Sequence, residues 1–333
     1  MRIKFVLPLV LLLFILSACQ LFSGATPTTS PLVGTIVAAT LTANANATPL
    51  PEPSSTPTPM PPPTLNPTDA PLGDIPAQAA SIPQPAGEVT ILLMGSDQRP
   101  GAGDFRTDTM ILVVLKSDGS VNLVSFPRDL WVYLPGKFME RVNTPQEYGG
   151  FKLVQSTFQY NFGFTPQSYV LTNFSGFRYI IDTLGGIDVQ VGQTFTDARD
   201  GSPNGYTVHA GLVHMDSETV LWYIRARKTT SDLDRLRRAQ EVILAMGKRL
   251  LSLNALTRVP ELYSAVHGAI VTDLTLQDVV ALLPILQKVD PAKIQRYAIS
   301  TDQVTSFITS GGADVLLPRP DAIRQVLLQA LGN

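Results

Sequence analysis

The segment from residue 20 to residue 88 limits what this chain can fold into. It holds 15 of the 27 prolines, is rich in threonine, serine and alanine, and has no lysine or arginine. Such a composition cannot build a hydrophobic core, so we expect a disordered spacer there. The globular part must come from residues 89–333, which are numerous enough to form one large domain.

The first 19 residues have the pattern of a bacterial export signal. Arg2 and Lys4 precede an apolar run over 5–16, which is too short to span a bilayer core. Small residues then precede Cys19, as in a lipobox, so we expect Cys19 to be lipidated; the alternative is an incidental cysteine in an uncleaved anchor. Both interpretations predict an exported protein held on the outer face of the cytoplasmic membrane.

The charge of the expected domain is balanced. Two of the 25 basic residues and four of the 27 acidic residues precede residue 89, which leaves 23 of each. Proteins that bind nucleic acid usually carry a basic excess, so we expect no nucleic-acid partner. Cys19 is the only cysteine, which excludes an intramolecular disulfide and leaves thiol-based zinc or redox chemistry without support.

Short aliphatic runs alternate with helical patterns along residues 89–333. We expect strands at 89–94, 110–115, 121–126 and 187–191, and helices at 151–162, 177–184, 217–224 and from 232 onward. The last of these helices would begin with Asp232 as its cap and bury Leu236, Ala239 and Ile243 on one face. The part from 252 to 333 is expected to be mostly helical, with at least one strand. This order predicts a three-layer α/β/α sandwich around a mixed central sheet.

Arginine recurs at breaks in this pattern in five short segments, four of which have aspartate beside it. Forked guanidiniums beside carboxylates suit a metal-bound phosphate or diphosphate. The segments are SDQR (96–99), FRTDT (105–109), FPRDL (126–130), YIRAR (223–227) and DLDRLRR (232–238).

Asp97 and Asp108 are the candidate metal ligands. Asp97 directly follows the first expected strand, where α/β folds place their ligands, and Asp108 lies beyond a loop that contains Gly101 and Gly103. Two carboxylates with water and phosphate oxygens suit magnesium, whereas zinc would require histidine or cysteine. Either aspartate alone is better explained as a turn or cap residue; the pair, between two arginines, favours a site.

The remaining arginines are the candidate anion ligands. Arg128 follows the third expected strand beside Asp129. Arg225 and Arg227 are two residues apart, which would place both on one side of an extended segment. Arg235 and Arg238 are three apart and would share a helix face. Each pair alone is more typical of a solvated surface, but their clustering in an uncharged domain favours one site.

These segments together resemble the LytR-CpsA-Psr family of bacterial envelope proteins. The resemblance extends over 89–251, the core motifs of the expected domain. The matching strings are ILLMGSDQR, FRTDTMILVVL, VNLVSFPRDLWVYLPG, RVNTPQEYGG, YVLTNFSGFRYIIDTLGGIDVQV and YIRARKTTSDLDRLRRAQEV.

The resemblance implies a magnesium-dependent enzyme that moves a glycopolymer phosphate from a polyprenyl diphosphate carrier to a hydroxyl of peptidoglycan or another wall acceptor. It also implies an apolar channel for the prenyl chain. In this sequence Asp97 and Asp108 would hold the metal. By the resemblance the diphosphate would contact Arg106, Arg128, Arg225, Arg227 and Arg235. From the same segments we add Arg99, Arg238 and Gln240 as candidate phosphate contacts.

Several alternatives stay open at this point. Asp129 or Asp232 would accept the proton of the acceptor hydroxyl, and each has a structural alternative, as a partner of an arginine or as a helix cap. Ala239 stands where the family has a phosphate-contacting glutamine, so we expect weaker binding unless Gln240 substitutes for it. A prenyl-diphosphate-binding sensor or regulator without transfer activity, or a prenyl diphosphate phosphatase, would share much of the same site.

Overall fold

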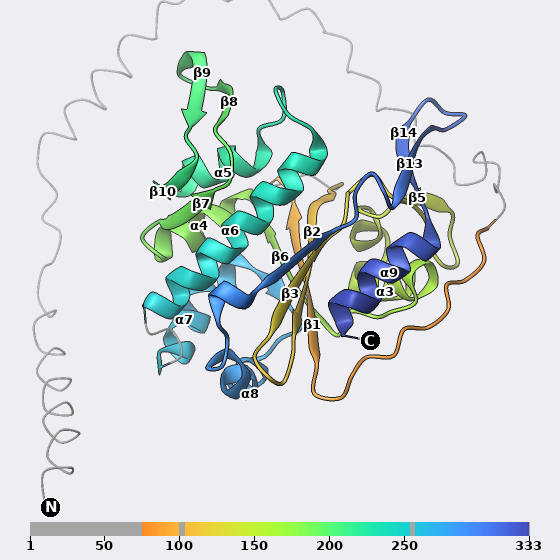
Figure 1. Cartoon of the computed structure of the whole chain (residues 1–333), viewed down its shortest axis with the longest axis horizontal. Helices are drawn as coiled ribbons and strands as arrows, with labels where there is room; N and C mark the ends of the chain where they lie inside the picture. Colours follow the sequence, from red (N-terminus) through yellow and green to blue (C-terminus); the bar gives the residue numbers. More distant parts are fainter. Residues whose placement is uncertain (1–74, 100–103, 254–256, 333) are drawn as a thin grey trace, which may run out of the picture. The chain divides into compact units, whose positions relative to one another are not determined.

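A six-stranded mixed sheet forms the centre of the computed structural model (Figure 1), which describes residues 75–99, 104–253 and 257–332. The strand order is β11-β6-β1-β2-β3-β12, with β1 antiparallel to β2 and parallel to β6. The export signal, Cys19 and most of the expected spacer lie outside the described residues. The strands of the sheet are β1 (Val89–Ser96), β2 (Thr107–Leu115), β3 (Val121–Ser125), β6 (Ser168–Asn173), β11 (Val271–Thr272) and β12 (Gln295–Ala298).

Helices cover both faces of this sheet, which confirms the expected three-layer α/β/α architecture. Helices α3 (Pro145–Phe162) and α9 (Pro320–Leu331) lie on one face, and α6 (Asp232–Ser252) and α8 (Leu276–Leu286) lie on the other (Figure 1). Among the described residues, no helix is long and apolar enough to cross a bilayer.

The pleat of β2 explains why both faces are covered. Met110, Leu112 and Val114 belong to the core on the α3 and α9 side. Their neighbours Ile111 and Leu115 belong to the core on the α6 side. Because successive side chains of a strand point to opposite faces, the aliphatic run 110–115 of β2 must be buried on both.

A second group of elements packs beside α6. Most of its buried residues come from α4 (Phe174–Thr183), α5 (Ser217–Arg225) and the antiparallel pair of β7 (Ile187–Val191) with β10 (Gly211–Met215), and Phe195 and Val208 of a neighbouring hairpin also belong to it. The other elements are α7 (Val259–Val266) and three further strand pairs. These are β4 (Trp131–Tyr133) with β5 (Met139–Arg141), β8 (Phe195–Arg199) with β9 (Ser202–Val208), and β13 (Val304–Ile308) with β14 (Asp314–Pro318).

Local signals explain several element ends. Helix α4 stops before Gly185 and Gly186, whose φ angles of 70° and 81° suit glycine and end the helix as the sequence predicted. Helix α6 corrects a prediction, because its N-cap is Ser231 and not Asp232. The Ser231 hydroxyl accepts a hydrogen bond from the Asp234 amide at 3.2 Å. The side chain of Asp232 is therefore available for other contacts.

The domain begins before Val89, which corrects the predicted boundary of the spacer. Ile82 is buried in the core on the α3 side, and its amide donates to the carbonyl of Gly163 at 2.7 Å. The amide of Ala79 donates to the carbonyl of Tyr160 at 2.8 Å. These backbone contacts tie the end of the proline-rich segment to α3, which composition alone does not reveal.

The C-terminal part contains more strand than its sequence pattern suggested. Besides α7, α8 and α9, it contributes β11 and β12 to the two edges of the central sheet and adds the β13–β14 hairpin. Strand β6, which pairs with β1 at the centre of the sheet, was also missed. These strands have only 2 to 6 residues, too few to show a clear alternation.

Candidate active site

Most of the predicted charged residues lie at the end of the sheet where β1 and β3 finish and α6 begins; Figure 1 shows these elements. Asp97 follows β1 directly, and Arg128 lies three residues beyond the end of β3. The register of β1 and β2 shifts here, because Gly95 is opposite Thr109 while Ser96 is opposite Thr107. Asp108 is the extra residue of this bulge, a device that turns a side chain out of the ladder.

Arg128 is the centre of the charged cluster. Its Nη1 donates to Oδ2 of Asp108 at 2.8 Å, while Nε lies 3.4 Å from Oδ2 of Asp129 and Nη2 lies 3.7 Å from Oδ2 of Asp232. Burial by itself would lower the pKa of Arg128, but these three carboxylates raise it above its ordinary value. Arg128 is therefore positively charged, and its guanidinium is held by carboxylates from β2, from its own neighbour Asp129 and from α6.

Arg235 enters the same cluster from the first turns of α6. Its Nη2 donates to the backbone oxygen of Asp108 at 3.4 Å, and its Nε lies 3.8 Å from Oδ1 of Asp232. Burial, together with the positive charges of Arg128 and Arg227, lowers the pKa of Arg235. Two neighbouring guanidiniums that repel one another favour binding of a multiply charged anion between them.

Asp129 lies between Arg128 and Arg141. Its Oδ1 is 3.1 Å from Nε of Arg141, and its backbone oxygen accepts from the amide of Leu316 in the β13–β14 hairpin at 2.8 Å. Burial raises the pKa of Asp129, although both arginines oppose this shift. The contacts of Asp129 fix the orientation of Arg128 and connect the site to the hairpin.

Asp97 and Asp108 lie on adjacent segments, and their carboxylate oxygens differ in how many hydrogen bonds they already accept. Oδ1 of Asp97 accepts from the Arg106 amide at 2.7 Å, and Oδ1 of Asp108 accepts from Nδ2 of Asn143 at 3.0 Å. Nearby, the Ser96 hydroxyl and the side-chain oxygen of Asn143 are buried without a hydrogen-bond partner in the described chain. Carboxylate oxygens beside unsatisfied neutral oxygens are a donor set that fits a hard cation such as Mg²⁺.

The described residues contain no cluster of three or more acidic, histidine or cysteine side chains around one metal position. The protein would supply only part of a coordination shell. This is compatible with magnesium, which commonly uses one or two carboxylates together with waters and substrate phosphates.

Four other predicted arginines are exposed. In the described part of the chain, the side chains of Arg99, Arg106 and Arg227 form no ion pair, and the guanidinium of Arg225 lies 4.3 Å from the centre of the Phe174 ring. Arg225 and Arg227 line a common pocket, although Arg225 is the last residue of α5 and not part of an extended segment. Exposed cations without carboxylate partners are available to a ligand.

Arg238 occupies a different environment from the one predicted. Its side chain has no exposed surface, and its Nη1 and Nη2 donate to the backbone oxygens of Tyr223 and Ala226. Its Nε donates to Oδ2 of Asp234 at 2.9 Å. With these donors engaged inside the fold, Arg238 holds the end of α5 against α6 and does not face a phosphate beside Arg235.

Gln240 also lies away from the charged cluster. It is buried, and its Nε2 donates to the Ser125 hydroxyl at 2.8 Å and to the Tyr297 carbonyl at 2.7 Å. These contacts fasten α6 to β3 and β12, so Gln240 does not substitute for the glutamine that the family resemblance implied at position 239. Ala239 itself packs on the apolar face of the sheet with Ile111 and Leu123.

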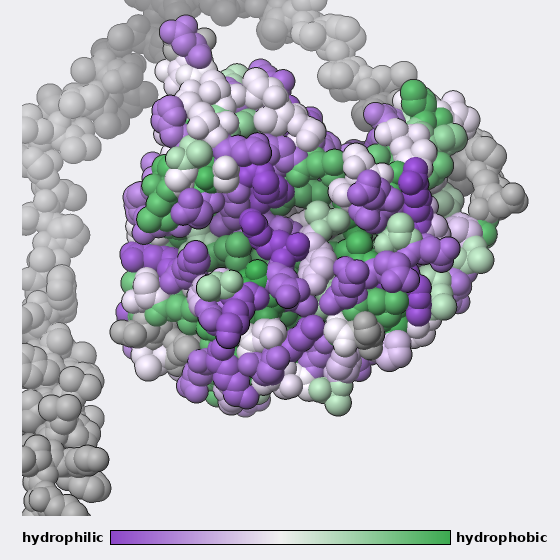
Figure 2. All heavy atoms as spheres, in the orientation of Figure 1, coloured by the Kyte–Doolittle hydropathy of each residue, from purple (hydrophilic) through white to green (hydrophobic). Residues whose placement is uncertain are grey.

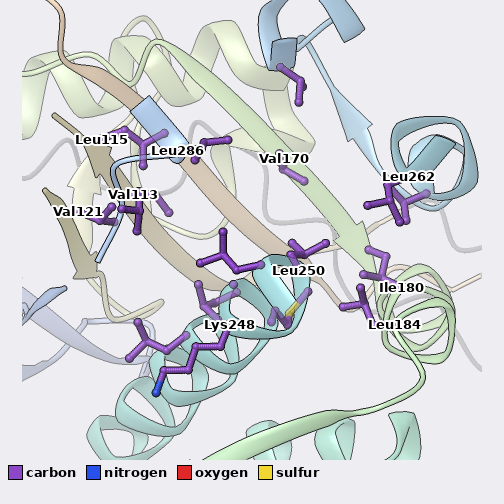
Figure 3. Close-up of a pocket in the computed structure, with 18 of the residues that line it drawn as sticks. Val113, Leu115, Val121, Val170, Ile180, Leu184, Lys248, Leu250, Leu262 and Leu286 are labelled. Carbon is purple, nitrogen blue, oxygen red and sulfur yellow. The ribbon is translucent and has the colours of Figure 1, made fainter. Parts of the chain in front are cut away.

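One face of α6 joins the charged cluster to an apolar cavity. Arg235, Ala239 and Ile243 are spaced four residues apart, which places them along one face of the helix. Ile243 lines a cavity of about 490 Å³ between α6, the sheet and helices α4, α7 and α8 (Figure 3). The side chains labelled in that view are aliphatic except Lys248, whose nitrogen points away from the others.

Arg141 and Asn143 are site residues that single-residue reasoning missed. Both belong to the string RVNTP, which begins with the last residue of β5, and both contact carboxylates of the cluster. Their position within a string shared with the family was a usable signal. Their roles depend on the return of the chain from β5 to the beginning of β2, which no local pattern specifies.

Comparison with known proteins identifies the group to which this architecture belongs. The profile of the LytR_cpsA_psr family matches residues 66–327. The chain belongs to the LytR_cpsA_psr family. The matched region begins before Val89, as the packing of Ile82 and Ala79 also requires.

Two curated relatives illustrate the family. The chain is 33% identical over 205 residues to the polyisoprenyl-teichoic acid–peptidoglycan teichoic acid transferase TagU of Oceanobacillus iheyensis, covering 59% of this chain and 62% of TagU. It is 28% identical over 193 residues to the regulatory protein MsrR of Staphylococcus aureus, covering 56% of this chain and 57% of MsrR. The aligned part therefore spans about three fifths of the length of these relatives.

Solved structures of this family share the fold. The crystal structure of B. subtilis TagV superposes with a TM-score of 0.62 and 23% identity, covering 74% of this chain and 98% of that one. TagT bound to LIIa-WTA gives a TM-score of 0.60 and 21% identity, covering 77% and 97%. Both support the arrangement of sheet and helices described above.

Proposed function

We propose that this protein transfers a glycopolymer phosphate from a polyprenyl diphosphate carrier to a hydroxyl of peptidoglycan. The observation that carries this proposal is the face of α6 that runs from Arg235 past Ala239 to Ile243 and the apolar cavity. A ligand that fits both ends must have an anionic head and a long apolar tail, as a prenyl diphosphate does. The name of the relative TagU, a polyisoprenyl-teichoic acid–peptidoglycan transferase, supports the same chemistry.

In the proposed reaction the acceptor oxygen attacks the phosphorus next to the glycan. The bond from that phosphorus to the bridging oxygen breaks, and prenyl phosphate leaves. Arg128 and Arg235, whose guanidiniums flank Asp232, would stabilise the charge that develops on the transferring group. Arg225 and Arg227 would hold the diphosphate from the open side, since positioning and charge stabilisation are the main requirements of phosphoryl transfer.

Asp232 is the carboxylate that we propose as the proton acceptor. Ser231 caps α6, so the Asp232 side chain is not needed as the helix cap. Asp232 is also more exposed than Asp129, and it lies next to both Arg128 and Arg235. Asp129 is held between Arg128 and Arg141, so its proposed role is to position Arg128.

We further propose that magnesium binds at Asp97 and Asp108. When bound, it would neutralise part of the diphosphate charge. Asp108 would then be shared between the cation and Arg128, because its Oδ2 is already 2.8 Å from Nη1 of Arg128. The domain is proposed to work on the outer face of the membrane, attached through lipidated Cys19, where a prenyl-linked donor would be available.

The direct test is transfer of a labelled glycan from a synthetic polyprenyl diphosphate donor to peptidoglycan by the purified protein with magnesium. Formation of labelled peptidoglycan that requires Arg128 supports the proposal. Release of free glycan phosphate into water would indicate a phosphatase. Tight binding of the donor without any turnover would indicate a sensor, and either result would reject the transferase.

A further inference from the structure

A second pocket adjoins the proposed diphosphate site. It has a volume of about 320 Å³ and lies between residues 197–200, where β8 leads into its hairpin turn, and residues 225–228 at the end of α5. It shares Arg225 and Arg227 with the proposed diphosphate site and adds Arg199 and Lys228. In Figure 1 the β8–β9 hairpin projects beside α5 at the end of the sheet where the charged cluster lies.

The four cations of this pocket lack carboxylate partners. In the described part of the chain, none of Arg199, Arg225, Arg227 and Lys228 forms an ion pair, whereas Arg128, Arg235, Arg237 and Arg238 all do. Figure 2 shows hydrophilic side chains gathered over α6 and the neighbouring end of the sheet. A concentration of unpaired cations in a domain of balanced charge indicates a position for an anion.

The acidic residues of the pocket do not neutralise these cations. Asp197 is only 3% exposed, and its carboxylate accepts the amides of Ala198 at 2.6 Å and Lys228 at 2.7 Å. The Asp197 carboxylate is therefore occupied by backbone amides and does not pair with the four cations. Asp200 is exposed at the hairpin turn, where water screens its charge.

The pocket is also ordered before any ligand arrives. Besides the bond from the Lys228 amide to Asp197, Nε1 of Trp222 donates to the Ala198 carbonyl at 2.8 Å, and the Thr229 hydroxyl donates to the Thr196 carbonyl at 2.5 Å. These three hydrogen bonds fix strand β8 against the segment that carries the arginines.

Arg199 is held in the same way. Its guanidinium carbon lies 4.3 Å from the centre of the Tyr206 ring, and its Nη2 donates to the Thr219 hydroxyl at 3.3 Å. Stacking on an aromatic ring leaves the other edge donors of the guanidinium available. The entropic cost of ordering this cation for a ligand is therefore small.

We propose that this pocket is a second anion subsite, which binds a phosphate group carried on the glycan of the donor, beyond the diphosphate. This inference rests on the proposed function and deepens it. Arg225 and Arg227 would contact the diphosphate and the start of the glycan, while Arg199 and Lys228 would contact the further phosphate. The pocket would make this protein selective for phosphate-bearing glycopolymers over neutral ones.

The test compares two synthetic polyprenyl diphosphate disaccharides that differ only in a glycerol phosphate on the terminal sugar. The wild type is expected to use the phosphate-bearing donor with a kcat/KM about tenfold higher, a gain of the size that one or two charge-assisted hydrogen bonds provide. Arg199→Gln with Lys228→Gln should abolish this preference and keep the rate on the neutral donor. Arg199→Lys, which retains the charge, should retain most of the preference.

Matched measurements separate charge from folding. Arg296→Gln removes an exposed cation on β12 outside the pocket and should leave the preference unchanged. Melting temperatures of all variants should agree within a few degrees. A wild type without donor preference would overturn the inference, as would a double variant that loses the same factor on both donors.

A binding experiment separates this inference from the transferase proposal. A soluble oligo(glycerol phosphate), which lacks the prenyl diphosphate, should bind the wild type in a salt-sensitive manner and bind the double variant more weakly. If neither disaccharide donor is transferred but this binding is seen, the proposed function fails and the subsite stands. If the double variant instead loses only its binding to phosphatidylglycerol vesicles, the pocket recognises lipid head groups and the inference is wrong.

Discussion

Nη1 of Arg128 lies 2.8 Å from Oδ2 of Asp108, so the arginine after β3 is paired with the bulged aspartate of β2. This contact joins the proposed metal ligand directly to the proposed phosphate ligand. A change in either residue must therefore affect the other. It also explains why the site depends on the register of two neighbouring strands.

The first prediction concerns the guanidinium group of Arg128, which contacts three carboxylates at once. Arg128→Lys keeps a positive charge but cannot reach Asp108, Asp129 and Asp232 at once, because an ammonium is a point donor and not a planar fork. We expect kcat for glycan transfer to fall by about 10²-fold to 10³-fold, as on removal of one preorganised donor. Arg296→Lys is the control. Wild-type kcat in Arg128→Lys would show that only charge is needed at this position.

The second prediction separates the two carboxylates. Asp232→Asn should lower kcat by about 10²-fold to 10⁴-fold, the usual contribution of a general base, with little change in the free energy of unfolding. Asp129→Asn should lower stability as well, because Arg128 and Arg141 would share a neutral partner. Transfer assays and urea unfolding of both variants provide the comparison. A reversed pattern, with kcat lost only in Asp129→Asn, would assign the proton to Asp129.

The third prediction concerns the apolar cavity. Gly247 of α6 lines it, and a Cβ added there meets no atom within 4 Å. Gly247→Phe should fill part of the cavity and raise KM for a long-chain prenyl donor, with little effect on a two-isoprene analogue. Gly247→Ala, the matched control, should stabilise the helix by about 0.5–1 kcal/mol and leave KM unchanged. Equal losses of Gly247→Phe on both donors would exclude the cavity as the site of the prenyl tail.

The fourth prediction tests the structural role of Gln240. Gln240→Ala leaves the half-buried Tyr297 carbonyl and the buried Ser125 hydroxyl without their shared donor, which should lower the free energy of unfolding by about 1–3 kcal/mol. The KM of the folded variant for donor should not change. Exposed Gln277 provides a control variant, Gln277→Ala, for the unfolding measurement. A raised KM with unchanged stability would restore Gln240 to the phosphate site.

The fifth prediction concerns Glu88, next to the first strand. Its side chain is 6% exposed, Oε1 has no hydrogen-bond partner in the described chain, and burial raises its pKa from 4.5 to about 7, although Lys116 opposes the shift. The folded state thus binds this proton more tightly than the unfolded state. Wild-type stability, relative to Glu88→Gln, should therefore fall as pH rises from about 4.5 to about 7.

The shift of the Glu88 pKa limits how much this carboxyl group can change the free energy of unfolding. Above pH 7 the Glu88→Gln variant should be the more stable protein, by at most about 3 kcal/mol, because its neutral amide avoids burial of a charge. Chemical denaturation of both proteins at pH 5 and pH 8 measures the difference. An identical difference at both values would show that Glu88 does not titrate in this range.

Much of the fold follows from local sequence. The aliphatic runs of β1, β2 and β3 and the glycine pair after α4 predicted their elements because burial on two faces and positive φ angles leave local signatures. The short strands β6, β11 and β12 carry no such signature. They are held by pairing with strands from distant parts of the chain, so only the assembled sheet defines them.

For the candidate site, sequence alone determined which residue types were available: Asp97, Asp108, Arg128 and the arginines of the last two segments. The tertiary structure decided how they are used. Arg235 and Arg238 looked equivalent three residues apart, yet one joins Arg128 while the other is enclosed with its donors on backbone carbonyls. The physical reason is that a local pattern fixes a side chain's chemistry and its face on a helix, whereas its burial and its partners depend on which other segments the fold brings against that face.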